Sequence, residues 1–441
     1  MGRFQGLIGV AVLLAIAWLL SNNRSRINLR IVVWGLGLQL LLAILILRSP
    51  LGYPFFSLLD RGVGQLLSFS DEGASFLFKP LNPKYVVEYD ALGDGADSGD
   101  GPAAESAPER LRLRAVGNGG IAPMVQTLAF VVLPTVIFFA ALMSVLYHLR
   151  VMPAVVRALA WIMRKTMGTS GAETLSVAAN IFVGQTEAPL FVRPFLSGMT
   201  RSELMTVMCG GFATIAGGVM AIYVSVLRNH VPNIAGHLMA ASVMGAPAAL
   251  VIAKIMHPET ETSQTAGDEP ILLERRTRNL LEAIGNGATD GLRLALNIAA
   301  MLIAIVALVA MVNFVLNQFG TSLEAMLAVG FRPIAWCIGV PWDEAGLVGT
   351  LLGEKIVLTE LIAYLHLSDV MNNEALSDRS AVIASYALCG FANFASIGIQ
   401  IGGIDALAPD RKADASEIAL RAMIGGALAT CLNAAVAGVV M

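Results

Sequence analysis

The chain has 441 residues, of which 56% are hydrophobic and 14% are charged, and its formal net charge at pH 7 is −3. Soluble domains carry about 25% charged residues, so this composition, with a mean hydropathy of +0.71, excludes an ordinary soluble protein and indicates one embedded in lipid. The weakly negative charge argues against a nucleic-acid partner, and the absence of CxxC and HExxH patterns argues against a disulfide framework or a metal enzyme.

Apolar segments recur from the start of the chain to its end. A helix that spans a bilayer needs about 20 apolar residues. The first segment, LIGVAVLLAIAWLL, has no small-residue cleavage site before Asn22 and Asn23, so we interpret it as a retained span and not as a signal peptide. Eight transmembrane helices are predicted, at 4–20, 31–48, 122–148, 205–227, 234–256, 292–317, 381–404 and 417–440.

Three polar or amphipathic segments separate these spans. Residues 54–70 have an amphipathic pattern and are expected to lie along the membrane interface. Residues 71–120 contain the run DALGDGADSGDGPAAESAPER, which cannot bury enough apolar surface to fold, so this segment is predicted to be a disordered external loop. Residues 258–275 are predicted to form a polar cytoplasmic loop.

Two further segments, 169–196 and 346–368, are only moderately apolar. Each is interrupted by glycine and contains acidic residues, which makes it a poor ordinary span. Irregular backbone is tolerated at membrane depth where protein buries it. We therefore predict that both segments are re-entrant hairpins.

The distribution of cations sets the expected orientation. Arg24, Arg26 and Arg30 follow the first span, and cytoplasmic loops carry an excess of such residues. The loop is therefore expected inside, and both termini outside. Counting onward, the hairpin at 169–196 enters from the cytoplasm and the hairpin at 346–368 enters from the outside.

Two stretches that follow the hairpins read alike: CGGFATIAGGVMAIY (209–223) and CGFANFASIGIQIGG (389–403). Since the hairpins enter from opposite faces, the two halves form an inverted repeat, in which broken helices meet near the bilayer midplane. The alternative is a chance recurrence of Gly-Phe-Ala in helices rich in glycine and alanine. The predicted fold class is an all-α integral membrane protein with eight transmembrane helices and two opposed re-entrant hairpins in an inverted repeat.

The first hairpin carries a cluster of polar side chains. Gly184 and Pro189 break the helix, and Gln185, Thr186 and Glu187 supply both donors and acceptors at one tip. This set suits a neutral ligand with many hydrogen-bonding groups, such as a nucleobase. The alternative is a tip whose side chains satisfy only its own backbone.

The second hairpin and the helix after it supply a different set. Glu360 offers two acceptor oxygens to a vicinal diol, Asn393 and Ser396 share a helix face that could complete the diol site, and Phe391 offers an aromatic face to a base. Ordinary helix packing is the alternative for Phe391. In the same hairpin, Glu354 and Lys355 are expected to offset each other as a pair.

A cation site is also predicted. Sodium prefers oxygen ligands, by the hardness argument that applies to calcium. The Asn180 amide, the Val183 carbonyl, the Thr214 hydroxyl and carbonyl and the Ile215 carbonyl could supply them, since the run ATIAGG (213–218) is expected to be unwound. The alternative for Thr214 is a hydrogen bond to its own helix backbone.

Long stretches of the chain resemble the concentrative nucleoside transporters. They are LPTVIFFAALMSVLYHL (133–149), AANIFVGQTEAPLFVRPF (178–195), CGGFATIAGGVMAIY (209–223), GEKIVLTELIAY (353–364) and CGFANFASIGIQIGGIDALAP (389–409). The resemblance covers roughly 122–441. It implies a homotrimer whose subunits work independently, each with a scaffold domain and a transport domain that moves like an elevator.

The resemblance also implies roles for individual residues. Gln185, Thr186, Glu187 and Val219 would hold the base; Glu360, Asn393, Ser396 and Phe391 would hold the ribose and stack on the base; Asn180, Val183, Thr214 and Ile215 would bind sodium. The second hairpin has Thr359-Glu360-Leu361 where the family usually has Asn-Glu-Phe. This departure puts ribose affinity or ion choice in doubt.

The resemblance divides the chain into scaffold and transport segments. They are 1–70 (scaffold spans and interfacial helix), 71–120 (external loop), 121–168 (scaffold), 169–256 (transport repeat 1), 257–345 (cytoplasmic loop, scaffold span and external segment) and 346–441 (transport repeat 2). We expect a secondary active importer of nucleosides such as uridine, cytidine or adenosine, coupled to sodium, in a bacterial inner membrane and without an enzymatic cofactor. The alternatives are a proton-coupled symporter, a membrane-embedded enzyme that uses buried Glu187 and Glu360 as acid and base, and a channel.

Overall fold

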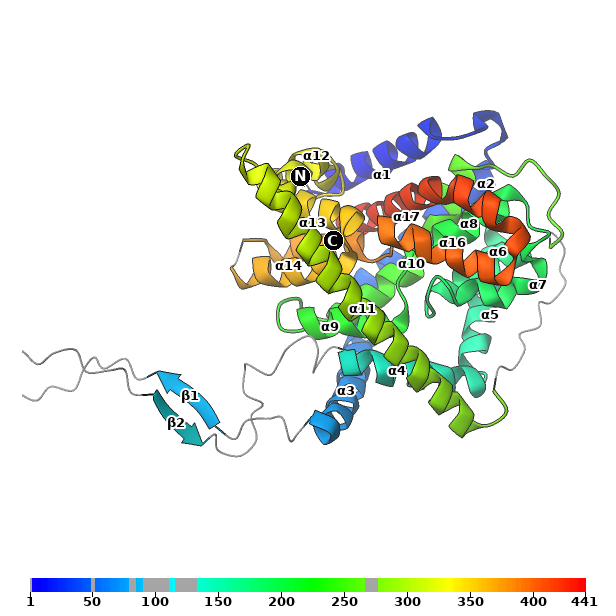
Figure 1. Ribbon diagram of the computed structural model, residues 1–441. Coiled ribbons are helices and arrows are strands. Elements are labelled where there is room, and N and C mark those ends of the chain that lie inside the picture. The colour runs from blue at the N-terminus through cyan, green and yellow to red at the C-terminus, as the bar shows by residue number, and fades with distance from the viewer. Residues whose placement is uncertain are drawn as a thin grey trace, which may run out of the picture.

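The computed structural model describes residues 2–48, 52–78, 85–89, 111–115, 133–265, 277–373 and 375–441. These residues are almost entirely helical (Figure 1). The first half contains α1 (Gly2–Leu19), the 3-10 helix η1 (Arg24–Arg26), α2 (Leu29–Leu47), α3 (Gly52–Phe78), strands β1 (Tyr85–Tyr89) and β2 (Leu111–Ala115), α4 (Leu133–His148), α5 (Val151–Met167), α6 (Gly171–Asn180), η5 (Ala188–Val192), α7 (Arg193–Leu196), α8 (Arg201–Ala213), α9 (Gly217–Leu227) and α10 (Ile234–Met256). The second half contains α11 (Leu280–Asn317), α12 (Leu323–Cys337), α13 (Ala345–Val357), α14 (Glu360–Asn372), α15 (Asp378–Leu388), α16 (Phe394–Leu407), η6 (Pro409–Arg411) and α17 (Lys412–Val440).

Several of these helices have the length and composition of membrane spans. In the described part of the chain, four are long and apolar enough: Leu29–Leu47, Arg201–Leu227, Ile234–Met256 and Pro409–Val440. Shorter apolar helices cover Phe4–Leu19, Val306–Asn317 and Phe394–Leu407, and α4 and α5 meet at an angle of 76°. The predicted segment 381–404 is divided between α15 and α16, and residues 122–132 lie outside the described residues.

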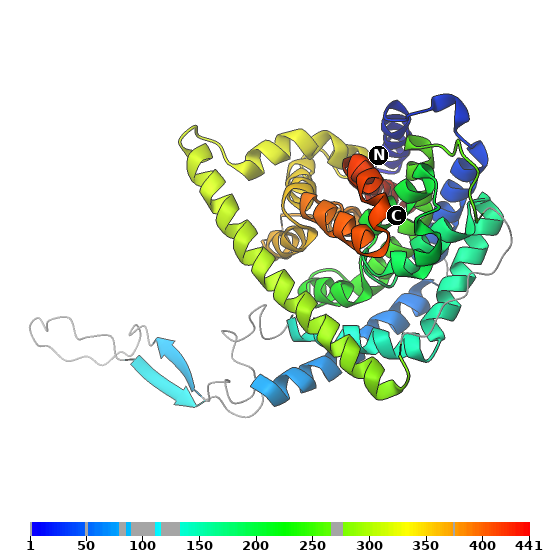
Figure 2. The ribbon, with the colours of Figure 1, turned by 45° about the vertical axis from the view of Figure 1, so that its right-hand side comes forward.

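The interior is built from α8, α10 and α17, most of whose side chains are buried. In both views α17 runs through the middle of the bundle, while α11 crosses one side of it obliquely (Figures 1 and 2). Along α11 large apolar side chains are exposed, including Leu281, Ile303 and Phe314 at 79%, 74% and 70%. A bundle with a packed centre and an apolar exterior is what lipid solvation requires.

Small residues let the central helices approach closely. A side chain at Gly426 on α17 would collide with Phe212 on α8. Close contacts of this kind are typical of helix pairs in membranes, where packing replaces the hydrophobic effect as the force for association. Of the four cysteines, Cys209, Cys389 and Cys431 are buried and Cys337 is partly exposed, and all four are free thiols.

Buried polar groups fix where the helices begin. Thr200 caps α8, because its hydroxyl accepts from the Glu203 amide and the Glu203 carboxylate accepts from the Thr200 amide, at 3.1 and 2.9 Å. Near the start of α6, the Glu173 carboxylate lies 2.8 Å from the Lys254 ammonium at the end of α10. The ion pair therefore ties the entry of the first predicted hairpin to a central helix.

The prediction of disorder over 71–120 is wrong for part of that segment. Residues 71–78 belong to α3, which also includes the predicted helix at 54–70. Strands β1 and β2 pair antiparallel, with Val87 opposite Leu113. LRLRA alternates apolar and charged residues with the period of a strand, and YVVEY is rich in the β-branched and aromatic residues that favour strands. The remaining residues of 71–120 and residues 266–275 lie outside the described residues.

Candidate functional site

The helical path is interrupted twice, once within each of the two similar stretches, 209–223 and 389–403. Residues 214–216 separate α8 from α9, within the run expected to be unwound, so that prediction is confirmed. Residues 389–393 separate α15 from α16. The interruptions touch, because the Phe391 amide donates to the Thr214 carbonyl at 3.4 Å. Broken helices leave carbonyls free to bind ligands.

The turn after α6 meets the first interruption. The Gly217 amide donates to the Phe182 carbonyl at 2.9 Å, which joins the turn to the start of α9. Gln185 is buried, Thr186 is half-buried and packs toward Gly403 on α16, and Val219 is buried in the first turn of α9. The turn and both broken helices therefore converge on one region.

The predicted sodium ligands lie at this junction. Asn180 ends α6 and is 1% exposed, yet neither its side-chain oxygen nor its nitrogen has a partner in the described part of the chain. Buried polar atoms without partners are rare, so this amide fits a ligand role. Thr214 and Ile215 are buried beside α8, and Val183 is half-buried in the turn.

The Thr214 hydroxyl donates to the Gly210 carbonyl at 3.0 Å. The alternative interpretation of Thr214, a bond to its own helix, is thus confirmed. That bond uses the hydroxyl proton and leaves lone pairs on the oxygen. The hydroxyl can therefore still coordinate a cation.

Glu360 is the first residue of α14 and lies at the centre of a buried cluster. One carboxylate oxygen accepts from the Tyr223 hydroxyl at 2.8 Å, and the other accepts from the Asn393 side-chain nitrogen at 2.8 Å. The Asn393 side-chain oxygen in turn accepts from the Ser396 amide at 2.8 Å. Asn393 is thus both the N-cap of α16 and a donor to the carboxylate.

A second polar contact lies further along α16. The side-chain nitrogen of Gln400 donates to the Gln185 side-chain oxygen and to the Met208 carbonyl, each at 3.0 Å. Asn393, Ser396 and Gln400 are all buried and recur at helical spacing, so they form one buried polar face, about 10 Å long at 1.5 Å per residue. Gly211 on α8 makes room, since a side chain there would collide with Gln400.

Two residues of this region were not among the predicted ones. Tyr223 ends the first similar stretch, and its hydroxyl in an apolar run required a buried partner. Gln400 follows Asn393 at seven residues and Ser396 at four within IGIQIGG. The polar group of Tyr223 in an apolar run and the helical spacing of Gln400 were therefore signals that the sequence already contained.

Two predictions about acidic residues are wrong. Glu187 is exposed and not buried, because it belongs to the open turn, where its carboxylate accepts from the Gly184 amide at 2.8 Å. This bond also confirms part of the alternative interpretation of the first hairpin, in which side chains at its tip hydrogen-bond to the backbone of the same turn. Glu354 does not pair with Lys355, because neighbours on a helix point in different directions; its carboxylate lies 2.9 Å from the His366 ring nitrogen.

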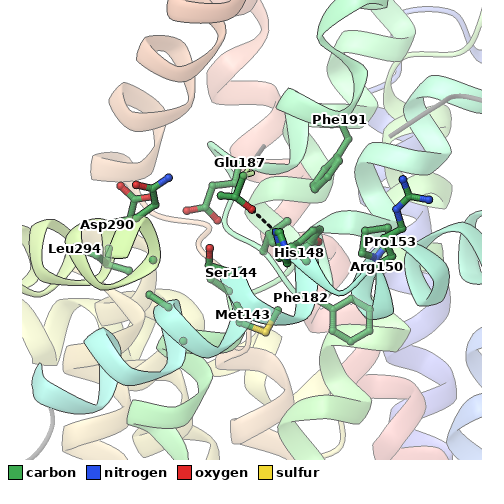
Figure 3. Close-up of a pocket in the computed structure, with 18 of the residues that line it drawn as sticks. Met143, Ser144, His148, Arg150, Pro153, Phe182, Glu187, Phe191, Asp290 and Leu294 are labelled. Atoms are coloured by element: carbon green, nitrogen blue, oxygen red, sulfur yellow. Dashed lines mark hydrogen bonds between the residues drawn. The ribbon is translucent and has the colours of Figure 1, made fainter. Parts of the chain in front are cut away.

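A cavity of about 370 Å³ lies beside the turn. Glu187 faces it from the turn, opposite Ser144 and His148 on α4 and Asp290 on α11 (Figure 3). His148 and Thr277 close part of its wall, with their side chains 2.7 Å apart. The lining also includes Val183, but it does not reach Glu360, Phe391, Asn393 or Ser396.

Three family profiles match the chain: "Na+ dependent nucleoside transporter N-terminus" over residues 8–81, "Nucleoside recognition" over 129–229 and "Na+ dependent nucleoside transporter C-terminus" over 237–438. The chain is 39% identical to the uncharacterized transporter YutK of Bacillus subtilis over 446 residues, which cover 99% of each chain. This chain belongs to the Na+ dependent, or concentrative, nucleoside transporter family. The resemblance inferred from its motifs is thereby confirmed.

Longer animal members of the family are equally similar. Solute carrier family 28 member 3 of Mus musculus is 39% identical over 99% of this chain, and sodium/nucleoside cotransporter 1 of Rattus norvegicus is 38% identical over 98% of it. The chain spans only 58% and 63% of the lengths of these relatives.

Solved structures of the family share the fold. The transporter CNTnw, in a structure described as inward-facing and substrate-bound, is 36% identical, covers 100% of this chain and superposes with a TM-score of 0.84. A doubly substituted CNTnw, described as outward-facing, also gives a TM-score of 0.84 at 37% identity. The chain is thus a multi-pass membrane protein with a transporter fold, and the interpretation as a membrane enzyme is excluded by its family.

Proposed function

We propose that this chain is a secondary active transporter that imports nucleosides with a sodium gradient. The observation that carries the proposal is the buried polar face of α16. Glu360 and Tyr223 lie at one end of it and Gln185 at the other. A ligand along this face would need hydrogen-bonding groups at both of its ends, as a nucleoside has in its base and its ribose.

The ribose end is the Glu360 cluster. The carboxylate has about four lone-pair sites, of which Tyr223 and Asn393 use two. The remaining sites would accept from the vicinal hydroxyls, with Ser396 beside them. Phe391 lies in the interruption before α16, from which its ring would stack on the base.

The base end is the turn after α6. Gln185 and Thr186 would bind the polar edge of the base, with Gln400 orienting the Gln185 amide. Val219 would supply apolar contact. Glu187, which faces the cavity, would accept from the base or from water around it.

The sodium ion would bind where α6 meets the first interruption. Asn180 would supply its unpartnered side-chain oxygen, Thr214 its hydroxyl and carbonyl, and Val183 and Ile215 their carbonyls. An oxygen cage without a carboxylate suits a monovalent metal ion and offers no residence for a proton. The ion would hold the turn against α9 and so preorganise the base end.

A proton-coupled mechanism is the second candidate, and the geometry at Glu360 argues against it. Asn393 must direct its NH₂ group at the carboxylate, because its oxygen is occupied by the Ser396 amide. The Tyr223 hydroxyl donates to the other oxygen. These two donors leave only the lone pairs that the ribose hydroxyls would use, so a proton bound to the carboxylate would compete with the nucleoside.

We propose the membrane arrangement from the charge pattern and the helices together. Eight spans and two re-entrant hairpins, 169–196 and 346–368, would place both termini outside a bacterial inner membrane. Segments 169–256 and 346–441 would move as the transport domain against the remaining scaffold, in a homotrimer. The cavity between α4, α11 and the turn carries Arg150 and Arg157 at its lining, as a cytoplasmic release path would.

The test is uptake into proteoliposomes. Labelled uridine and adenosine should accumulate when an inward sodium gradient is imposed and should only equilibrate when choline replaces sodium. Cytidine should compete. Accumulation driven by a pH gradient in choline would replace sodium with the proton, and no saturable uptake of any nucleoside would overturn the proposal.

A further inference from the structure

In the part of the chain that the structure describes, one buried lysine of the second repeat has no carboxylate at ion-pair distance. Lys355, in the last turn of α13, is 1% exposed. Its ammonium donates to the Ala387 carbonyl at 2.8 Å and to the Thr430 hydroxyl oxygen at 2.7 Å. Within the described residues, no carboxylate lies within 4.0 Å of this ammonium.

The other lysine that is buried among the described residues has a different environment. Lys254 is 4% exposed, and its ammonium lies 2.8 Å from Glu173 and 3.2 Å from Glu259. Buried charges are costly unless they are paired, so Lys254 is explained as a structural ion pair. Lys355 requires another explanation.

The ammonium of Lys355 is bound to the end of a broken helix. Ala387 is the next-to-last residue of α15, so its carbonyl is one of the four that have no partner within the helix. This end of a helix carries a partial negative charge that favours cations. The Thr430 hydroxyl donates its own proton to Ala427, so its oxygen is free to accept from Lys355.

The first repeat has a related junction with no such lysine. There α6 packs against α8, and the last residue of α6 is Asn180, with its unpartnered side chain. In the second repeat α13 packs against α15, and the corresponding last turn of α13 carries Lys355. The two junctions are built alike. In each, the end of the first helix of a predicted hairpin (α6 or α13) lies near the end of the helix that precedes an interruption (α8 or α15).

We propose that the Lys355 ammonium is a tethered cation that takes, in the second repeat, the place that sodium takes in the first. It neutralises the end of α15 and provides positive charge on the side of Glu360 without an ion from solution. The inference rests on the proposed sodium coupling and extends it to stoichiometry. Because the tethered charge returns with the protein in each cycle, this junction contributes no sodium ion to the charge that moves with the nucleoside.

The test replaces the lysine by the residue found in the first repeat. Lys355→Asn removes the charge and supplies a side-chain oxygen beside Ala387 and Thr430. The Hill coefficient of uptake for sodium should rise above that of the wild type, because a second ion site raises the upper bound that the number of sites sets on it. The ratio of charge to nucleoside moved should also rise. Lys412→Asn, which removes a surface lysine, should leave both quantities unchanged.

A measurement independent of transport keeps the proposal testable if the variant is inactive. In detergent, Lys355→Asn should unfold at a lower temperature than the wild type in choline chloride, and sodium chloride should raise its unfolding temperature more than it raises that of the wild type. If the Lys355→Asn protein cannot be purified, Lys355→Gln, which also supplies a side-chain oxygen, is compared in the same way. A sodium response equal to that of the wild type in the purified variant overturns the proposal. An absent sodium response in the wild type instead overturns the proposed coupling.

Discussion

The backbone amide of Phe391 donates a hydrogen bond to the carbonyl oxygen of Thr214 across 3.4 Å. Thr214 lies in the interruption between α8 and α9, and Phe391 lies in the interruption between α15 and α16. A carbonyl oxygen has two lone pairs, so it can accept from Phe391 and coordinate an ion. Ion binding at Thr214 would therefore hold the Phe391 backbone, which predicts that sodium and nucleoside strengthen each other's binding to the same extent.

Thr214→Ala should raise the sodium concentration for half-maximal uridine uptake by about tenfold, the effect of losing about 1.4 kcal/mol of binding. Thr206→Ala is the matched control. Thr206 is also buried on α8, and its hydroxyl makes the same kind of bond to the Ser202 carbonyl, at 2.9 Å. Sodium titrations that shift equally for both variants would show a structural effect only.

Glu360→Gln should reduce uridine uptake by roughly ten- to hundredfold, because a hydrogen bond to a charged group contributes about 1.5–3 kcal/mol. The amide would also direct an NH₂ group at Tyr223 or Asn393, which both donate to this position. Uptake is compared at equal amounts of protein in the membrane. Glu417→Gln, at a site 63% exposed, is the control, and full uptake by Glu360→Gln would remove the carboxylate from the site.

Gln400→Met should raise the KM for uridine by about tenfold, since it leaves the Gln185 amide without its orienting donor. Gln39→Met provides the comparison. Gln39 is equally buried, and its side-chain nitrogen donates to the Asn433 oxygen at 3.0 Å, a contact between α2 and α17 that does not involve the turn carrying Gln185. Equal changes in KM for both variants would mean that the Gln400 contact only stabilises the fold.

Ribose hydroxyls should matter for binding. We expect 2′,3′-dideoxyuridine to inhibit uridine uptake at least about tenfold more weakly than unlabelled uridine, because Glu360, Asn393 and Ser396 would each lose a partner. Inhibition curves in a saturating sodium gradient give the comparison. Coincident curves would show that this cluster does not bind the ribose.

Removal of residues 90–108 should leave uridine uptake and assembly unchanged. The deletion spares β1 and β2, which lie apart from the helical body in both views (Figures 1 and 2). Uptake and size-exclusion chromatography of the shortened chain provide the measurement. Loss of assembly would show that the deleted residues pack against the protein.

The sequence identified the helical class and the family, and it pointed to many of the residues that lie at the turn and at the two interruptions, because hydropathy and long motifs are local properties. It did not identify partners that are distant along the chain. Tyr223 and Glu360 are 137 positions apart, and Gln185 and Gln400 are 215 apart, so each bond depends on packing between the two halves.

The exposure of a side chain in a turn could not be predicted from the sequence either. Glu187 lies in a predicted hairpin whose flanking residues are apolar and was expected to be buried, but the turn opens its side chain to the cavity. Adjacent Glu354 and Lys355 suggested a pair, whereas the helix directs one to His366 and the other to Ala387. Direction around a helix axis, and not proximity in sequence, decided both partners.

The burial of three of the four cysteines has a practical consequence for measuring motion. Cys209, Cys389 and Cys431 are shielded from thiol reagents, and Cys337 is the remaining, partly accessible thiol. Cys337→Ser would therefore remove the accessible native thiol that could react with a label, without disturbing the packed centre of the bundle. Cysteines could then be introduced for spin labels at two exposed positions, Arg228 at the end of α9 and Gln318 at the end of α11. The distance between these labels in a lipid membrane would report the position of the proposed transport domain relative to the scaffold.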